Sequence, residues 1–316
     1  MVNVTEVGTR TLAAALLALV VVVAMAVLAL VAAGPGPDEL RARAGELQSA
    51  RTLERSTFGS STLEELRLVS TSGLTARCAA RAPRATGGSA GTDRHPAFLL
   101  VAGYETGRRA VEFPEVGGVV LLACDYPLRL PERLTARAFW SSLSELRRGV
   151  LDTPPTLLLA LDYLAAREDV DPGSLAIVGA SVGVPPATVA TALDRRVGAV
   201  ALLYGGADLP LLFAHNVDLG NAWANRAARA AVAVITRPVE PARFAPDVTP
   251  RPALAVNARQ DPFIPIASAR ALHRALREPK EVRWLELDHV AAFHERTLLA
   301  GLTALAREWF REQGVA

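Results

Sequence analysis

Ser181 is the side chain whose surroundings best suit covalent chemistry. It lies in Gly179-Ala180-Ser181-Val182-Gly183, a G-x-S-x-G pattern that directly follows the apolar segment 175–178. A serine placed this way between a strand and a helix sits on a sharp, strained turn, and small neighbours let the strand and the helix approach each other. The turn lifts the hydroxyl clear of the sheet edge, where a base and an acyl carbonyl can reach it. The pattern therefore predicts a nucleophile.

The same pattern occurs again at residues 87–91, within the Gly-, Ser- and Thr-rich stretch 84–94. No strand-like segment precedes this second copy, so we interpret it as a loop. The strand–turn–helix context is what favours Ser181 over Ser89. The alternative role for Ser181 is that of a small residue in a tight turn.

A candidate acid and a candidate base follow two later strand-like segments. Asp261 comes shortly after segment 252–257, and His289 follows segment 282–287 almost directly. Because ligands bind beyond the carboxyl ends of parallel strands, we expect these side chains to meet Ser181 there. Serine, acid and histidine then stand in the chain order of a catalytic triad, in which the histidine accepts the serine proton and the acid orients the imidazole.

Each of these assignments has a competitor. Asp261 could instead cap the next helix or form an Asx turn before Pro262. Asp208, which follows segment 197–203, is a second candidate acid for which a turn role is favoured. His294 competes with His289 as the base, but it lies at the start of the last expected helix, where a surface or packing role is favoured.

The elements that must position these residues alternate along the chain. Near-continuous apolar segments of strand length alternate with segments of helical pattern, and the strand-like segments are 97–102, 118–124, 175–178, 197–203, 252–257 and 282–287. This alternation is typical of an α/β fold with a mostly parallel central sheet and helices on both faces. Before it, segments 66–71 and 74–80 predict an antiparallel pair of strands.

Two proline pairs bear on the helices of this fold. Pro154 and Pro155 predict the start of a helix, because proline is tolerated in a first turn. Pro185 and Pro186 closely follow Ser181. We therefore expect the helix after Ser181 to begin late or with a distorted first turn.

The composition divides the chain into a polar tail (1–10), an apolar run (11–33), a segment containing Gly34-Pro35-Gly36-Pro37 (34–61) and a globular domain (62–316). Residues 34–61 predict a juxtamembrane stalk, with a disordered linker as the alternative. Within the domain, residues 209–247 interrupt the alternation beyond the end of a strand. They predict a cap over the sheet or an ordinary surface insertion.

The apolar run 11–33 carries no charge, and about 20 such residues span a bilayer as a helix. A cleaved signal peptide usually has a shorter apolar core, of about 7–15 residues. We therefore expect a single-pass membrane anchor rather than a signal peptide. The arginines that follow the run favour a cytoplasmic domain, whereas large domains after an N-terminal anchor are commonly exported. The side of the membrane on which the domain lies is left open, and the extracytoplasmic side is slightly favoured.

The overall composition excludes several classes of function. The net charge of +2 indicates no nucleic-acid partner, and the five histidines form no H-E-x-x-H zinc motif. No G-x-G-x-x-G follows a strand, so no dinucleotide cofactor is expected. Because the zinc motif is missing, no metal is expected either. Cys78 and Cys124 lie far apart in the sequence. Two separate buried side chains are favoured for them over a disulfide.

With these motifs in place, residues 62–311 resemble the α/β-hydrolase superfamily, in particular bacterial esterases and dienelactone-hydrolase-like members. Residues 261–265, Asp-Pro-Phe-Ile-Pro, are similar to the D-x-x-x-P acid loop of that superfamily. Residues 98–104 resemble its oxyanion strand and loop, although Ala102-Gly103 stands where His-Gly is usual, and Asp288 replaces a glycine often found before the histidine. The expected oxyanion donors are the backbone N–H groups of Tyr104 and Val182. The alternative for Tyr104 is a plain loop residue.

The sequence thus predicts a membrane-anchored serine hydrolase. We expect it to cleave a small-molecule carboxylic ester or thioester through an acyl-enzyme on Ser181, with no cofactor. Acyl transfer or peptide cleavage would use the same triad. The alternative from another class is a catalytically silent binding protein of the same fold. The features that favour it are Pro185, Pro186 and Asp288.

Overall fold

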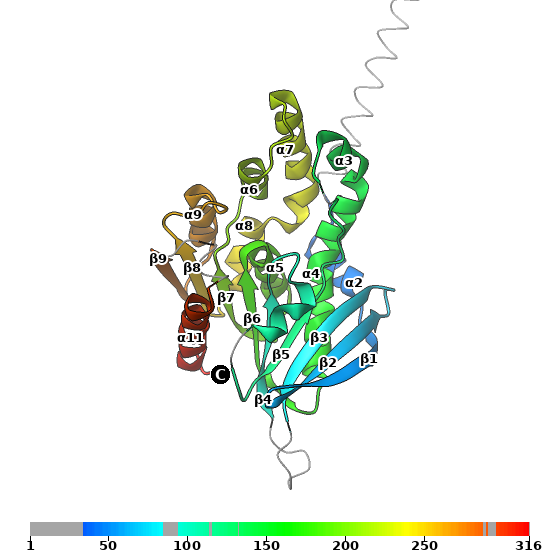
Figure 1. Cartoon of the computed structure of the whole chain (residues 1–316), viewed down its shortest axis with the longest axis vertical. Coiled ribbons are helices and arrows are strands. Elements are labelled where there is room, and N and C mark those ends of the chain that lie inside the picture. The colour runs from blue at the N-terminus through cyan, green and yellow to red at the C-terminus, as the bar shows by residue number, and fades with distance from the viewer. Residues whose placement is uncertain are drawn as a thin grey trace, which may run out of the picture.

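A nine-stranded sheet forms the centre of the protein (Figure 1). The computed structural model describes residues 34–84, 94–113, 116–131, 133–286, 289 and 295–315. The strands are β1 (Leu47–Phe58), β2 (Ser61–Ser70), β3 (Thr75–Pro83), β4 (His95–Val101), β5 (Val120–Cys124), β6 (Val170–Ala180), β7 (Val197–Leu203), β8 (Ala253–Ala258) and β9 (Lys280–Leu285).

The strand order is β1-β2-β3-β5-β4-β6-β7-β8-β9. Strands β1, β2, β3 and β5 pair antiparallel in that order, whereas β5, β4, β6, β7, β8 and β9 are all parallel. The expected α/β class with a mostly parallel sheet is therefore confirmed, as is the antiparallel pair β2–β3. Because β4 lies between β5 and β6, the chain reverses its direction of travel across the sheet at β4. A ligand site is expected at such a switch point.

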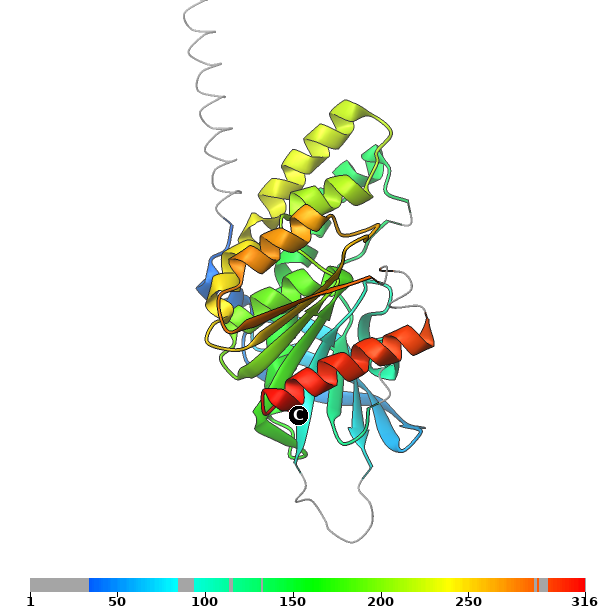
Figure 2. The same cartoon turned by 90° about the vertical axis from the view of Figure 1, so that its left-hand side faces the viewer.

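Helices cover both faces of the sheet. They are α2 (Pro37–Ala44), α3 (Ala136–Ser141), α4 (Leu143–Ala165), α5 (Val184–Leu193), α6 (Leu209–Asn216), α7 (Ala222–Thr236), α8 (Pro241–Phe244), α9 (Ile266–Ala275) and α11 (Arg296–Glu312), with the 3₁₀ turns η1 (Gly107–Glu112), η2 (Ser181–Gly183), η3 (Arg237–Val239) and η4 (Ala245–Val248). One apolar core joins a sheet face to α2, α4, α5 and α9, and a second joins the other face to η1 and α11. Figure 2 shows α11 crossing that second face.

Residues 37–58, which we expected to form a stalk or linker, instead belong to the fold. Helix α2 buries Leu40 and Ala44, and its Arg43 pairs with Asp152 of α4. Strand β1 pairs with β2 along its whole length. Its side chains are almost all exposed, so the sequence lacks the apolar alternation that marks a half-buried strand. The domain therefore begins well before the expected boundary at residue 62.

The helix expected to start at Pro154 starts earlier, and that prediction was wrong. Helix α4 spans Leu143–Ala165 and contains Pro154 and Pro155 in its interior, both buried. The hydroxyl groups of Thr153 and Thr156 donate to the carbonyl oxygens of Gly149 and Asp152 in the turns around these prolines. Burial of the surrounding leucines against the sheet outweighs the cost of proline within this helix.

The two cysteines are joined, contrary to the expectation of separate side chains. Cys78 of β3 and Cys124 of β5 stand directly opposite each other in the antiparallel register and form a disulfide. Both residues are buried, as expected. The pairing depends on the register of two strands that are not consecutive in the sequence.

The first part of residues 209–247, helices α6 and α7, forms a helical layer with α3 beyond the carboxyl ends of the strands (Figure 1), whereas Val239 and Phe244 pack in the main apolar core. Phe139 and Leu146 pack there with Ala228, Val232 and Ile235 in a small apolar cluster of their own. The choice between a cap and a surface insertion for residues 209–247 stays a prediction.

The expected tail and membrane anchor, residues 1–10 and 11–33, lie outside the described residues. Among the residues that are described, no helix combines the length and the apolar character needed to cross a bilayer.

His273 is a buried titratable group on α9. Its Nε2 atom lies 2.8 Å from Oδ1 of Asn257 on β8, and its ring packs edge-on against Trp284. Burial, together with the nearby ammonium group of Lys280, lowers the pKa of His273 from 6.5 to about 4. The folded protein therefore holds this imidazole neutral at pH values where the unfolded chain protonates it.

The stability of the fold should consequently fall as the pH is lowered from 6.5 to 4. Over that window the unfolded chain takes up a proton that folded His273 does not, which costs at most about 3 kcal/mol of the free energy of unfolding. Below pH 4 this group contributes no further change. Chemical denaturation as a function of pH should show a shallower slope for His273→Gln than for the wild type. Equal slopes would contradict the assignment.

Candidate active site

The turn after β6 holds Ser181 in a strained backbone conformation. Its φ of 55° lies in the left-handed region, which few non-glycine residues occupy. Both glycines of the pentapeptide are required by close contacts. A Cβ on Gly183 would lie 1.8 Å from the carbonyl oxygen of Val101, and one on Gly179 would lie 2.6 Å from Cβ of Ala187. The strand–turn–helix context expected from the sequence is confirmed.

The helix after this turn begins late, as the two prolines predicted. Residues Ser181–Gly183 form the 3₁₀ turn η2, and the α-helical hydrogen bonding starts only at Val184. Pro185 and Pro186 then occupy the first turn of α5, where missing N–H groups cost little. The irregular start leaves the Ser181 hydroxyl in contact with His289.

His289 links the other two predicted residues. Its Nε2 atom lies 2.9 Å from Oγ of Ser181, and its Nδ1 atom lies 2.9 Å from Oδ2 of Asp261. Because a carboxylate only accepts, Nδ1 carries the proton and donates it to Asp261. Nε2 then accepts the hydrogen bond of the Ser181 hydroxyl. The structure thus brings all three predicted residues into one hydrogen-bonded chain.

Asp261 uses its two oxygens for two purposes. Oδ2 accepts from His289, while Oδ1 accepts from the backbone N–H groups of Phe263 and Ile264 at 2.8 and 2.9 Å. The side chain is 1% exposed, and these three donors offset the cost of burying its charge. Asp261 therefore both forms the Asx turn and orients His289, two roles that we considered as alternatives.

The competing residues take other positions. Asp208 caps the N-terminus of α6, where its side chain accepts from the N–H of Leu211 at 3.2 Å. This is the turn role that the sequence favoured. His294 lies outside the described residues.

Two aromatic side chains hold the imidazole in place. Tyr204 and Phe263 pack edge-on against the ring of His289, with ring centroids at 5.6 and 5.3 Å. Tyr204 follows β7 directly and is fully buried. Neither residue was predicted from the sequence to be functional. The one signal for Tyr204 was its place immediately after a predicted strand.

The loop after β4, which holds the expected oxyanion donor Tyr104, is anchored by two tyrosine hydroxyls. Tyr126 donates to the carbonyl oxygen of Ala102 at 2.6 Å. Tyr104 donates to the carbonyl oxygen of Leu128 and accepts from the N–H of Leu130, both at 3.0 Å. Burial raises the pKa of Tyr126, so its hydroxyl stays protonated as a donor.

This anchored loop lies against the turn that carries Ser181. A Cβ on Gly183 would come within 3.2 Å of the carbonyl oxygen of Ala102. The backbone of Val182 is therefore close to the loop that precedes Tyr104. The assignment of the N–H groups of Val182 and Tyr104 as oxyanion donors stays a prediction. Tyr126 is a supporting residue that the sequence analysis missed, since nothing in the sequence indicates which carbonyl its hydroxyl reaches.

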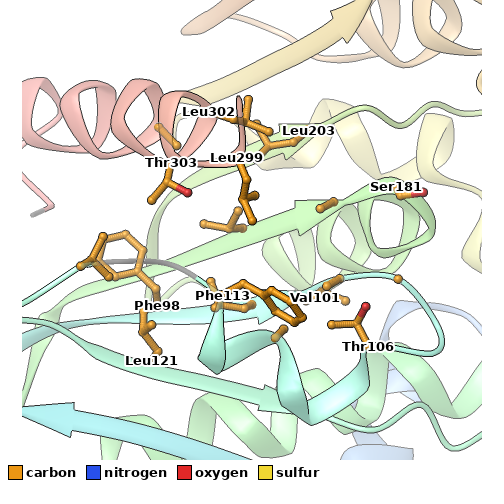
Figure 3. Close-up of a pocket in the computed structure, with 18 of the residues that line it drawn as sticks. Phe98, Val101, Thr106, Phe113, Leu121, Ser181, Leu203, Leu299, Leu302 and Thr303 are labelled. Atoms are coloured by element: carbon orange, nitrogen blue, oxygen red, sulfur yellow. The ribbon is translucent and has the colours of Figure 1, made fainter. Parts of the chain in front are cut away.

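A pocket of about 570 Å³ begins at Ser181 and His289 and extends between the sheet and α11. Its volume falls within the range typical of small-molecule sites. Figure 3 shows Ser181 at one end and Phe98 towards the other. The wall is mostly apolar and comes from the sheet, the η1 region and α11, including Phe98, Leu100, Val101, Ala110, Phe113, Leu121, Val178, Leu203, Leu299, Leu302, Thr303, Ala306 and Phe310. None of the lining residues lies within residues 209–247.

The helical layer instead touches the loop that carries the acid. Nε2 of His215 donates to the carbonyl oxygen of Pro262 at 2.9 Å. The side-chain amide of Asn216 donates to the carbonyl oxygen of Phe263 at 2.8 Å. Helix α6 therefore supports the segment that orients His289. Across the described ranges, no group of three or more His, Cys, Asp or Glu side chains is arranged to hold a metal ion.

Known proteins share this architecture at low sequence identity. The chain matches no family model and no curated protein sequence. An acetyl xylan esterase from Paenibacillus sp. R4 superposes with a TM-score of 0.65 at 18% identity, over 85% of this chain and 92% of that one. Acetyl xylan esterase 1 from Thermoanaerobacterium sp. JW/SL YS485 gives 0.59 at 15% identity, over 88% and 93%.

A 2,6-dihydroxy-pseudo-oxynicotine hydrolase is also similar, with a TM-score of 0.55 at 16% identity over 76% of this chain and 66% of that one. At such identities the likeness concerns the fold alone. The chain has the α/β-hydrolase fold.

Proposed function

We propose that this protein is a serine hydrolase that cleaves carboxylic esters through an acyl-enzyme. One observation carries the proposal: the hydrogen-bonded chain from Ser181 through His289 to buried Asp261, placed at one end of an apolar pocket. The similarity to two acetyl xylan esterases supports this class of reaction.

In the first half of the reaction, Oγ of Ser181 bonds to the ester carbonyl carbon while its proton moves to Nε2 of His289. The carbonyl electron pair moves onto oxygen, where the N–H groups of Val182 and Tyr104 are proposed to bind it. Loss of one such donor costs about 10²–10³ in rate. The tetrahedral intermediate collapses as the bond to the alkoxy oxygen breaks. That oxygen takes the Nε2 proton and leaves as an alcohol.

In the second half, water attacks the acyl carbon and gives a proton to Nε2 of His289. The bond to Oγ of Ser181 breaks, the proton returns to Oγ, and a carboxylic acid leaves. Asp261 stays ionised throughout and stabilises the imidazolium that forms in each half. No step needs a group from outside the chain other than the ester and water.

We also propose that residues 11–33 anchor the domain in a membrane and that the domain lies on the extracytoplasmic side. The uncharged apolar run supports the anchor. The disulfide between Cys78 and Cys124 supports the side, because disulfides persist in oxidising compartments and are rare in the cytosol.

A fluorophosphonate probe tests the nucleophile. The full-length protein should be labelled because His289 activates the Ser181 hydroxyl, and Ser181→Ala should abolish the labelling. Ser89→Ala, in the second copy of the pentapeptide, is the matched control and should label like the wild type. A folded wild-type protein that never labels would sink the hydrolase proposal and favour a silent binding protein.

Asp261→Asn should lower kcat by on the order of 10⁴ while leaving the fold intact. The asparagine oxygen can still accept from the N–H groups of Phe263 and Ile264, so the loop keeps its turn. Its NH₂ group then faces Nδ1 of His289, which favours the tautomer in which Nε2 is protonated and cannot act as a base. Ester-hydrolysis kinetics and thermal melting check both points. Asp208→Asn, which alters the other candidate acid, should keep full activity, and equal losses in the two variants would contradict the assignment.

Fractionation of bacterial cells that express the full-length protein tests the membrane assignment. The protein should remain in the membrane pellet after a carbonate wash, and protease added outside spheroplasts should digest the domain. Deletion of residues 11–33 should release the protein from the pellet. Recovery of the intact wild-type chain in the soluble fraction, or its protection from external protease, would contradict the anchor or the side respectively.

A further inference from the structure

The pocket at Ser181 is elongated and follows one face of α11. The helix contributes Leu299, Leu302, Thr303, Ala306 and Phe310, which recur at the spacing of a single helical face. Figure 3 shows Leu299, Leu302 and Thr303 reaching from α11 towards the strands below. The wall opposite them is the apolar surface of the sheet.

Two independent measures give the length of this pocket. Phe98 pairs with Ala176, five residues before Ser181, which corresponds to about 16 Å along the strand. Along α11, the eleven helical steps from Leu299 to Phe310 also correspond to about 16 Å. An acetyl group would fill only the end of such a space.

The chemistry of the wall suits a hydrocarbon chain. Away from Ser181 and His289, the polar side chains that line the pocket are those of Thr106, Thr303 and half-buried Arg307. The aliphatic stem of an arginine commonly covers apolar surface while its charged end stays in water. Phe98 and Phe310, both buried, pack edge-on with ring centroids 5.0 Å apart and form apolar wall at the end of the pocket away from Ser181.

We infer that this pocket holds a straight acyl chain, so that the substrates are esters of medium-chain fatty acids. The inference rests on the proposed ester hydrolysis. The acyl group stays bonded to Ser181 Oγ while the alcohol leaves and water enters, so a long pocket that begins at Ser181 suits the acyl group. Val182, which directly follows Ser181, is exposed and is not among the residues that line this pocket, so space beside Ser181 is left for the alcohol.

The chain-length profile of the full-length enzyme tests this inference. On p-nitrophenyl esters, kcat/KM should rise from acetate to octanoate or decanoate and fall at palmitate, which exceeds the pocket. Each methylene buried against the wall should raise kcat/KM about fourfold until the pocket is full. A maximum at acetate would overturn the inference while leaving the hydrolase proposal standing.

Two substitutions on α11 provide a matched pair. Thr303→Phe places a ring in the pocket and should lower kcat/KM for octanoate at least about tenfold more than kcat/KM for acetate. Ala304→Phe adds the same ring at an exposed position of the helix that does not line the pocket, and should leave the profile unchanged. Equal effects of Thr303→Phe on both esters would overturn the assignment.

A pair of isomeric esters distinguishes the acyl side from the alcohol side. Methyl octanoate and heptyl acetate have the same atoms, but only the first presents its long chain as the acyl group. Methyl octanoate should be hydrolysed at least about tenfold faster, because its chain alone fills the pocket. Faster hydrolysis of heptyl acetate would show that the pocket takes the alcohol and would overturn the inference.

Binding of decanoate to the Ser181→Ala variant separates this inference from the reaction itself. Titration calorimetry should detect binding that Thr303→Phe abolishes and Ala304→Phe preserves, whether or not any ester is hydrolysed. Absence of binding in a folded protein would overturn the pocket assignment. Binding without fluorophosphonate labelling of the wild type would overturn the hydrolase proposal instead and leave a fatty-acid-binding pocket.

Discussion

The close approach of Gly183 to the end of β4 is the contact on which the rest of the site depends. A single methyl group at this position would overlap the carbonyl of Val101. Because the contact is so close, the start of α5 is pressed against the loop that follows β4. Ser181 therefore has to turn through a left-handed conformation. The same approach places the turn beside the loop that Tyr126 and Tyr104 hold, so one steric constraint positions both the hydroxyl and its surroundings.

The acid and the base are positioned by a different principle, in which one buried group serves two partners. The two backbone donors on Oδ1 of Asp261 fix the carboxylate independently of His289. The imidazole then has one orientation that satisfies both the carboxylate and the flanking rings of Tyr204 and Phe263. Such a preorganised arrangement costs little reorganisation during a reaction.

The buried parts of the fold could be predicted, and the exposed parts could not. Segment 197–203 coincides with β7. A central strand of a parallel sheet is buried on both faces, so its sequence is a nearly continuous apolar run. Strand β1 has no such pattern, since its side chains face solvent. Asp261 and His289 were found through chain order, whereas Tyr126 acts through a hydroxyl whose partner depends on tertiary packing. The cysteine pair likewise depends on a register that neither strand encodes alone.

The exposure of β1 also bears on how the protein avoids aggregation. As the outermost strand of the sheet, it presents its outer backbone edge to any other extended chain, and long flat edges invite pairing between molecules. Two register irregularities bend the strand, and Arg51, Glu54 and Arg55 carry charges along it. A second molecule would have to desolvate those charges and match a bent backbone before it could extend the sheet. The polar character that hides β1 in the sequence thus acts as a barrier against edge-to-edge association.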